Sequence, residues 1–351
     1  MAGELNGRCP PLLKSLAHES CPAFGPDAYC PWGAVCNSST HPAYASESFF
    51  KLQKKTVIDY DSEVFPFGRF FREALLSEAE KMPHKYSSDT GQEFRDKTRF
   101  EARLQKKEMS YAAVSDFQQR LRDLPLSLIH LAVDPHCYTG AGSIGRGGGD
   151  AEPHLKLPKG NINRFFMRRL RPLYNKFICE VIAGNVAAAM APFECSSVFF
   201  QTSPCLRMNP PSATRATHPH IDAMYYHQPG QINFWLPLTD AYGNNSLWVE
   251  SAPFSLDHAP LVLRGEGQIA RFYGNRCIHF TVPNDTPHTR ITLDFRAVPG
   301  ILFDNDSKLS RDKFGSQMFS NGGYYSECRF DKAQGKWTII GKPKESGGLH
   351  S

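Results

Sequence analysis

Three segments in the second half of the chain alternate polar and apolar residues with a period of two, and this alternation restricts the fold more than any other feature. In the segment 290–298, Arg, Thr, Asp and Arg alternate with Ile, Leu and Phe, and the segments 231–238 and 277–282 show the same pattern. Successive side chains of a β-strand point to opposite faces, so each segment is predicted to be a strand with one polar and one apolar face. A sheet with its polar face in water would explain any single strand. Because three segments share the pattern, we predict that their polar faces line an internal cavity and that their apolar faces pack on a helical layer.

The pattern changes near Ser196, from a helical period to short strands separated by Pro, Gly and Asn turns. Before this point, apolar residues recur at helical spacing over 67–82, over 112–121 and from residue 162 onward. We therefore predict an α+β protein with an all-β core, a double-stranded β-helix or jelly roll with N-terminal helices packed on one sheet. The predicted strands are Ser197–Thr202, Gln231–Leu238, Ser246–Glu250, Gln268–Tyr273, Cys277–Val282 and Arg290–Val298.

The sequence predicts one structured domain between two less regular ends. The N-terminal residues are rich in Pro, Ser, Gly and Cys without periodicity, and the last residues resemble a disordered tail. The predicted parts are an extended Pro/Cys-rich arm over 1–45, a single domain over 46–300 (helical support 65–195, jelly-roll core 196–300), and a C-terminal extension over 301–351 that contains a hairpin around 324–340.

Composition and charge argue against several classes of partner. The chain has 40 basic and 35 acidic residues and no long basic block, so binding to nucleic acid or to a membrane surface has little support. No run approaches the roughly 18 apolar residues of a membrane span, and the N-terminus lacks an apolar signal core, so a cytoplasmic protein is expected. Cys9, Cys21, Cys30 and Cys36 lack zinc-site spacing, and free thiols in a reducing compartment are expected. The sequence does not indicate an oligomeric state.

A histidine and an aspartate two residues apart suggest a metal site. His220-Ile221-Asp222 is the only His-x-Asp triplet in the chain. On a strand these two side chains would project from the same face, roughly 6–7 Å apart along the backbone. Of the five histidines that follow Asp222, His279 alone lies in the middle of a predicted strand. His220, Asp222 and His279 together would form the 2-His-1-carboxylate set of Fe(II) oxygenases, although an isolated His-x-Asp also occurs by chance in many proteins.

An arginine follows the second histidine at a suitable distance. Arg290 lies eleven residues after His279, and Arg290-x-Thr292 opens the next predicted strand. A planar guanidinium matches a carboxylate through two hydrogen bonds, and a hydroxyl on the same face can add a third. The alternative interpretation of Arg290 is a surface charge at a strand end. Its offset from His279 favours a carboxylate-binding role.

These residues resemble the Fe(II)/2-oxoglutarate-dependent oxygenase superfamily, in particular its phytanoyl-CoA hydroxylase-like branch. The segments 230–240 and 245–251 are most similar to streptomycin-biosynthesis-type members, and the motif similarity covers about residues 200–298. The resemblance implies a dioxygenase of natural-product biosynthesis that uses Fe(II), 2-oxoglutarate and O₂, with ascorbate as reductant in vitro. It implies hydroxylation, oxidative cyclisation or desaturation at a C–H bond of a small polar or amino-acid-like metabolite, with release of succinate and CO₂.

The resemblance also implies roles for individual residues. The iron ligands would be His220, Asp222 and His279, and Arg290 with Thr292 would hold the distal carboxylate of 2-oxoglutarate. Further candidates for contact with the cosubstrate are Thr281, Asn233 and Gln201, and candidates for contact with the substrate are Arg207, Tyr225, Trp248 and Arg296.

Two other interpretations fit parts of the sequence. A cupin-type metal protein could use His218 and His220, but a cupin needs a carboxylate three or four residues further on, and Asp222 is too near. A catalytically silent jelly roll that binds a ligand is the second, although such a protein has no need for all three iron ligands. The glycine-rich segment 138–160 lacks the strand and helix of a dinucleotide site, and we interpret it as a loop that could form a lid.

Overall fold

The computed structural model describes residues 42–80, 119, 122–131, 169–253, 255–311 and 314–341. Several predictions fall outside these ranges and stay predictions. They concern the arm over 1–41, nearly all of the helix over 112–121, the glycine-rich segment 138–160, the start of the helix at 162 and the tail over 342–351.

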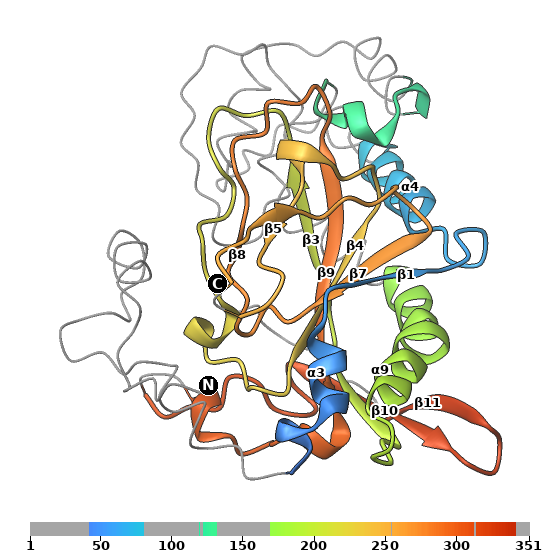
Figure 1. Ribbon diagram of the computed structural model, residues 1–351. Coiled ribbons are helices and arrows are strands. Elements are labelled where there is room, and N and C mark those ends of the chain that lie inside the picture. The colour runs from blue at the N-terminus through green and yellow to red at the C-terminus, as the bar shows by residue number, and fades with distance from the viewer. Residues whose placement is uncertain are drawn as a thin grey trace.

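A large antiparallel sheet runs through the middle of the molecule (Figure 1). Its strand order is β1-β7-β4-β9-β2-β10-β11, and β3 also pairs with β9. The strands are β1 (Thr56–Asp59), β2 (Ser197–Gln201), β3 (Cys205–Asn209), β4 (Ile232–Pro237), β7 (Gln268–Phe272), β9 (Arg290–Pro299), β10 (Tyr325–Asp331) and β11 (Lys336–Ile340).

The longest strand, β9, has neighbours on both edges. On one edge it pairs with β4, with Asn233 opposite Arg296 and Trp235 opposite Asp294. On the other edge its first half pairs with β3, with Arg207 opposite Thr292, and its last residues pair with β2. Directly opposite residues share a face of an antiparallel sheet. This register therefore brings the polar residues of β3, β4 and β9 together on one face.

A smaller antiparallel sheet contains β6 (Ala259–Pro260), β5 (Trp248–Val249) and β8 (His279–Phe280). The strands predicted over 246–250 and 277–282 are thus shorter than expected. The segment around β8 also forms backbone hydrogen bonds with the loop that precedes η5. His279 N donates to His220 O, and Thr281 N donates to Thr217 O. The large sheet lies between this smaller sheet and helices α4 and α9 (Figure 1).

The helices follow the apolar spacing of the sequence. The helix predicted from residue 67 is α4, and the third predicted helix is seen over 169–189, where α-helical turns over 169–177 continue through a π-helical stretch into α9. The helical elements are η1 (Pro42–Ala45), α3 (Glu47–Gln53), α4 (Phe67–Glu80), η2 (Leu126–Leu131), η4 (Ile178–Ile182, π-helical), α9 (Ala183–Ala189), η5 (Asp222–Tyr225), η6 (Gly243–Asn245), η7 (Gly300–Leu302) and η8 (Lys308–Ser310).

The hydrophobic core lies between the helices and the apolar face of the large sheet. Phe295 on β9 stacks on Phe234 of β4, with ring centroids 5.4 Å apart, and meets Tyr174 of the covering helix edge-on at 5.2 Å. The Tyr174 hydroxyl donates to the backbone oxygen of Gln201 at 2.8 Å. The predicted apolar face toward helices is confirmed for β4 and β9. It is wrong for the segment 277–282, because Ile278 packs on Ile221 in a separate cluster and Phe280 stacks on Trp248 of the smaller sheet.

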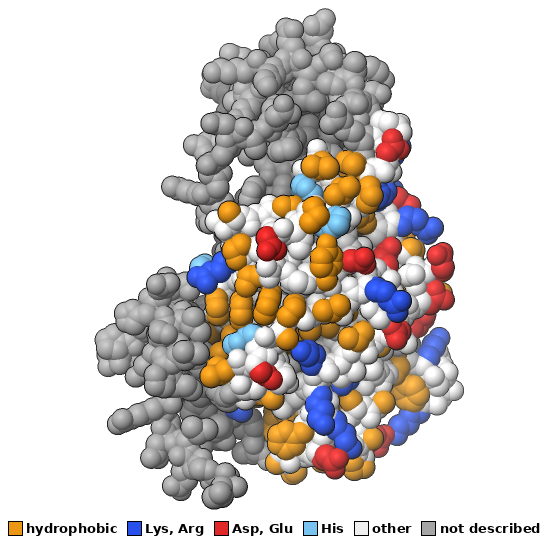
Figure 2. All heavy atoms as spheres, turned by 45° about the horizontal axis from the view of Figure 1, so that its top comes forward, with side chains coloured by type: hydrophobic (Ala, Val, Ile, Leu, Met, Phe, Trp, Pro, Cys, Tyr) orange, Lys and Arg blue, Asp and Glu red, His pale blue; other side chains and the backbone are white. Residues whose placement is uncertain are grey.

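The predicted hairpin around 324–340 is confirmed as β10 and β11, and β10 joins the large sheet by pairing with β2. None of the described helices is long and apolar enough to cross a membrane. On the face shown in Figure 2, basic and acidic side chains are interspersed among apolar and neutral ones.

Truncation of the core residue Phe177 should lower the free energy of unfolding by about 3–5 kcal/mol, the usual cost for a buried phenylalanine. Phe177 is fully buried, and its ring lies 5.1 Å from Phe65 and 5.2 Å from Phe67. Urea denaturation of Phe177→Ala measures the change. Phe50→Ala is a matched control, because Phe50 is 55% exposed, and it should cost less than half as much. Equal losses would contradict the assignment of Phe177 to the core.

Candidate metal centre

Two histidines and an aspartate meet beside the smaller sheet. His220 forms an isolated β-bridge with His279 of β8, and each backbone N donates to the other residue's O, at 3.2 and 2.9 Å. Asp222 is the first residue of η5, and its backbone N donates to Gly274 O at 2.8 Å. The backbone is extended at Ile221 and then turns, so residues 220–222 do not form the continuous strand considered from the sequence.

The three side chains converge on one point. One ligand atom from each of His220, Asp222 and His279 lies within 4.8 Å of the other two. Asp222 Oδ1 is 3.9 Å from His220 Nε2 and 3.6 Å from His279 Nε2. Nitrogen and oxygen ligands bind a divalent ion at about 2.1 Å, which separates them by roughly 3–4 Å. The three atoms therefore fit a single shared ion.

Each imidazole is oriented by a hydrogen bond at its other nitrogen. His220 Nδ1 lies 2.8 Å from His218 O, and His279 Nδ1 lies 3.0 Å from Cys277 O. Because a carbonyl can only accept, each Nδ1 is the donor in its bond, which leaves each Nε2 directed toward Asp222. Burial, followed by the neighbouring His279, lowers the pKa of His220 to about 3, so this ring is neutral at pH 7. A neutral imidazole oriented through its Nδ1 is the form that binds a metal.

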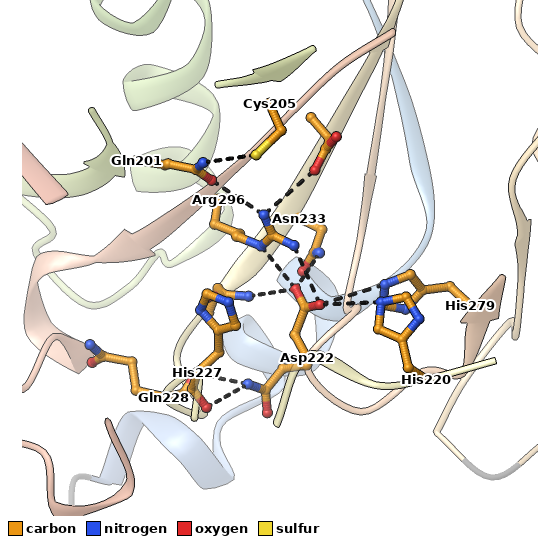
Figure 3. A network of polar contacts seen from close by, with 12 residues as sticks. Gln201, Cys205, His220, Asp222, His227, Gln228, Asn233, His279 and Arg296 are labelled. Atoms are coloured by element: carbon orange, nitrogen blue, oxygen red, sulfur yellow. Dashed lines mark hydrogen bonds and ion pairs between the residues drawn. The ribbon is translucent and has the colours of Figure 1, made fainter. Parts of the chain in front are cut away.

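The carboxylate of Asp222 is buried, and one of its oxygens accepts several hydrogen bonds (Figure 3). Oδ2 accepts hydrogen bonds from Asn233 Nδ2 at 2.7 Å, Gln231 Nε2 at 2.9 Å and Arg296 Nε at 3.0 Å. Burial opposes the charge of Asp222, but Arg296 and His279 outweigh it and hold the pKa of this carboxyl well below its usual range. Asp222 is therefore ionised whenever the protein is folded near neutral pH.

A chain of alternating charges leads from Asp222 along the polar face of the large sheet. Arg296 Nη1 lies 3.5 Å from Asp294 Oδ2, and Arg207 Nε donates to Asp294 Oδ1 at 2.6 Å. Asp294 raises the pKa of Arg207 above its ordinary value. The Arg207 side chain remains 42% exposed, whereas those of Arg296 and Asp294 are mostly buried.

Arg290 differs from these two arginines because no carboxylate forms an ion pair with it within the described chain, and Asp294 offsets its buried charge only in part. Among the described residues, no carboxylate lies within ion-pair distance of Arg290, and its Nε has no hydrogen-bond partner. Its Nη1 donates to Thr292 Oγ1 at 3.2 Å, and its guanidinium lies 5.3 Å from the centre of the Trp235 ring. Burial, followed by repulsion from Arg207, lowers the pKa of Arg290 to about 9. An anionic ligand beside Arg290 would relieve this cost.

A cavity of about 450 Å³, its open mouth included, connects these groups. This volume is in the range of small-molecule sites. The polar faces of the three strands line it, as the alternation in the sequence predicted. Its described lining includes His220, His279, Arg290, Asn233, Thr281, Arg207, Asp294, Arg296, Thr217, Trp235 and Leu247.

The other residues singled out from the sequence lie at varying distances from this cavity. Thr281 lines it, but its hydroxyl oxygen accepts from the backbone N of Ala216 and of Thr217. Gln201 lies behind it, where its Oε1 accepts from Arg296 Nη1 at 3.4 Å. Tyr225 is 49% exposed, with its ring 5.4 Å from that of His220.

Trp248 and Thr292 are the last two of these residues. Trp248 of β5 stacks on Phe280, and it is not among the residues that line the cavity within the described chain. Thr292 is buried and contacts Arg290. None of these contacts tests the roles in cosubstrate or substrate binding, which stay predictions.

Three residues of the site were not identified from the sequence. Gln231 contacts Asp222, and Asp294 joins two arginines. Both lie on the polar faces already recognised, so the alternation could have indicated them. Gly274 carried no signal. A Cβ atom there would lie 2.6 Å from Asn233 Nδ2, so only glycine leaves room for that amide.

The structure does not favour the cupin-type interpretation. Within the described residues, the group that could hold a metal contains His220, Asp222 and His279 and leaves out His218. The side chain of His218 is exposed, and this residue contributes its backbone oxygen to the orientation of His220.

Comparison with known proteins agrees with the resemblance in the sequence. No protein-family model matches the chain. This chain is 33% identical to the streptomycin biosynthesis protein StrG of Streptomyces griseus over 140 residues, which are 40% of this chain. The match spans 62% of that protein's length. The similarity to a streptomycin-biosynthesis protein is thereby confirmed.

Solved structures give weaker similarities. AviO1 from Streptomyces viridochromogenes Tue57 is 13% identical, with 76% of this chain and 99% of that chain covered and a TM-score of 0.33. A non-heme monooxygenase, the ThoJ-Ni complex, is 19% identical, with 33% of this chain and 49% of that chain covered and a TM-score of 0.27. The epimerase SnoN in complex with Fe³⁺, alpha ketoglutarate and nogalamycin RO is 16% identical, with 38% and 58% covered and a TM-score of 0.26. Similarities at these scores do not assign a function.

Replacement of a ligand should abolish metal binding, whereas replacement of the nearby His218 should not. We expect His279→Ala and Asp222→Ala to lose Fe(II) or Co(II) affinity by more than the roughly 10–100-fold that an outer-shell partner contributes. Equilibrium dialysis with metal analysis measures this. His218→Ala is the control, because its exposed side chain lies outside the ligand group. Loss of metal in His218→Ala, but not in Asp222→Ala, would favour the cupin-type interpretation.

Proposed function

We propose that the protein is an Fe(II)- and 2-oxoglutarate-dependent dioxygenase built on a double-stranded β-helix, in which the two antiparallel sheets enclose the cavity. The proposed reaction oxidises a C–H bond of a small polar or amino-acid-like metabolite in natural-product biosynthesis. It rests on one observation above all. Two residues of the ligand group, His220 and His279, line the same cavity as Arg290, a buried arginine with no carboxylate within ion-pair distance among the described residues.

The residues of the chain would hold the iron at one part of the cavity and the distal carboxylate of 2-oxoglutarate at another. His220, Asp222 and His279 each offer one ligand atom, which leaves three positions of an octahedral ion for cosubstrate and O₂. Bound Fe(II), 2-oxoglutarate and O₂ would supply the oxidising chemistry, with succinate and CO₂ as products. The protein supplies orientation and the exclusion of water.

Arg290 and Thr292 are proposed to bind the distal carboxylate of 2-oxoglutarate. Thr292 Oγ1 accepts a hydrogen bond from Arg290 Nη1, so its own hydroxyl hydrogen is available to the same carboxylate. The Trp235 ring beside the guanidinium helps to fix its plane. Thr281 and Asn233 line the cavity nearer the proposed iron and would limit the position of the cosubstrate.

The substrate would enter where Arg207 and Tyr225 are exposed. Arg207 donates its Nε and Nη2 to Asp294, so the remaining Nη1 can meet a polar group of the substrate. Tyr225 offers an aromatic wall beside His220. These positions support a small polar substrate and leave open whether hydroxylation, cyclisation or desaturation follows.

Turnover of 2-oxoglutarate tests the proposal directly. The purified full chain, supplied with Fe(II), ascorbate and 2-oxoglutarate, should form succinate, and a visible absorption band that depends on both Fe(II) and 2-oxoglutarate should appear under anaerobic conditions. Absence of both signals in a folded protein would leave the silent ligand-binding jelly roll as the better interpretation.

Removal of the unpaired guanidinium should weaken 2-oxoglutarate binding far more than metal binding. Arg290→Leu is expected to raise the dissociation constant for 2-oxoglutarate by at least about 30-fold, since loss of one partner of a buried hydrogen-bonded charge pair costs 2 kcal/mol or more. Anaerobic titration of the Fe(II) protein, followed at the visible band, gives this constant. Arg207→Leu is the comparison, and it should change 2-oxoglutarate affinity less than Arg290→Leu. The reverse order would place the carboxylate at Arg207.

A further inference from the structure

We propose that Arg296 is a positioning residue that, together with the amides of Gln231 and Asn233, makes Asp222 a metal ligand through Oδ1 alone. The inference rests on the metal centre of the proposed function and adds a role for three side chains around it. It replaces contact with the substrate as the role of Arg296, and contact with the cosubstrate as the main role of Asn233.

The two oxygens of Asp222 have different surroundings. Oδ2 receives three short hydrogen bonds, from Gln231, Asn233 and Arg296, at 2.7–3.0 Å. A carboxylate has about two acceptor positions on each oxygen, so Oδ2 is saturated. Oδ1 receives one long contact, 3.4 Å from Arg296 Nη2, and is the oxygen nearest to the Nε2 atoms of both histidines. A metal at the ligand group therefore meets Oδ1.

The guanidinium of Arg296 is largely committed to other side chains, because four of its five N–H groups have acceptors and one, on Nη2, is left. Nε and Nη2 donate to the two oxygens of Asp222, and Nη1 lies 3.4 Å from Gln201 Oε1 and 3.5 Å from Asp294 Oδ2. Within the described chain, all three nitrogens thus have partners. Asp294 contacts Arg296 through Nη1, away from the two nitrogens that bind Asp222, and Asp294 is itself held by Arg207.

The register of two neighbouring strands places the donors. Arg296 on β9 lies directly opposite Asn233 on β4, and Gln231 immediately precedes β4 on the same face as Asn233. Two cross-strand neighbours therefore reach one carboxylate oxygen. Figure 3 shows Arg296 and Asn233 approaching Asp222 from one side and His220 and His279 from the other.

This arrangement has a consequence for coordination. A carboxylate that binds through both oxygens would occupy one of the positions that the cosubstrate and O₂ need. Saturation of Oδ2 prevents that mode. The cation of Arg296 also balances the buried charge of Asp222 before a metal binds, so the ligand geometry exists in advance.

Gly274 allows a test that leaves every charge in place. A Cβ atom at Gly274 would lie 2.6 Å from Nδ2 and 2.7 Å from Cγ of Asn233. Gly274→Ala must therefore displace the Asn233 amide, or the backbone at Gly274 whose O accepts from Asp222 N, while every ligand residue and arginine keeps its identity. If the donors on Oδ2 control the coordination mode, this variant should change metal binding in the same direction as a change at Arg296.

The experiment is a Co(II) titration of the full chain without 2-oxoglutarate, followed by the visible absorption of the bound ion. Arg296→Met and Gly274→Ala should weaken Co(II) binding by about 10–100-fold, the range for loss of an outer-shell partner, and should shift the visible spectrum. Arg296→Lys keeps the charge but loses the planar fork, and it should fall between wild type and Arg296→Met. Arg271→Met is the matched control. It removes another buried arginine, whose partners are Asn185, Thr56 and the Lys51 oxygen, and it should leave the Co(II) spectrum unchanged.

The outcomes separate this inference from the proposed function. The role of Arg296 would be overturned if Arg296→Met and Gly274→Ala both kept the wild-type Co(II) affinity, visible spectrum and circular dichroism. That result would leave the metal centre intact. If Arg296→Met does not fold, Arg296→Lys and Gly274→Ala decide in the same way. Failure of the wild-type chain to bind Co(II) would overturn the metal centre and this inference together. Succinate formation plays no part in the readout.

Discussion

The antiparallel pairing of β9 with β4 on one edge and with β3 on the other is the constraint on which the rest of the site depends. The register sets Arg296 opposite Asn233 and Arg207 opposite Thr292, so that polar side chains from three strands share one face. The other face carries Phe234 and Phe295, which pack against the covering helix. A shift of the strand-pairing register by one residue would turn the polar side chains toward the helices and the apolar ones toward the cavity. The large apolar area buried under the helices thus holds the polar groups of the cavity in place.

Much of this arrangement could be predicted from the sequence, because alternation with a period of two reports directly on the faces of a strand. The alternation alone assigns Arg290, Asn233 and His279 to polar faces that line one cavity. The ligand group could be predicted because His220-Ile221-Asp222 is the only His-x-Asp triplet in this chain and because His279 lies within a recognisable strand pattern.

The pattern could not predict contacts that depend on three-dimensional approach. Arg296 has the same sequence signature as Arg290, and nothing in the alternation shows that one contacts a carboxylate whereas the other does not. Gly274 gave no signal, since its need for glycine arises from an amide on another strand. Asp222 begins a 3-10 helix because its backbone bonds to the loop at Gly274, a tertiary contact that overrides local extended preference.

The three arginines of the cavity differ in whether an anion of the described chain lies within ion-pair distance. Arg207 and Arg296 share Asp294, and Arg296 also meets Asp222, so each of these cations has an anion within the described chain. Burial of a charge is costly unless a partner offsets it, and for Arg290 the described residues supply only the more distant Asp294, which does not outweigh burial. An evolved site retains such a partly compensated cation where a ligand completes it. The negative charge of Asp222 is already balanced by Arg296, which also holds the carboxylate in the position from which it would bind a metal. For Arg290, the balancing charge would come from the bound 2-oxoglutarate of the proposed function.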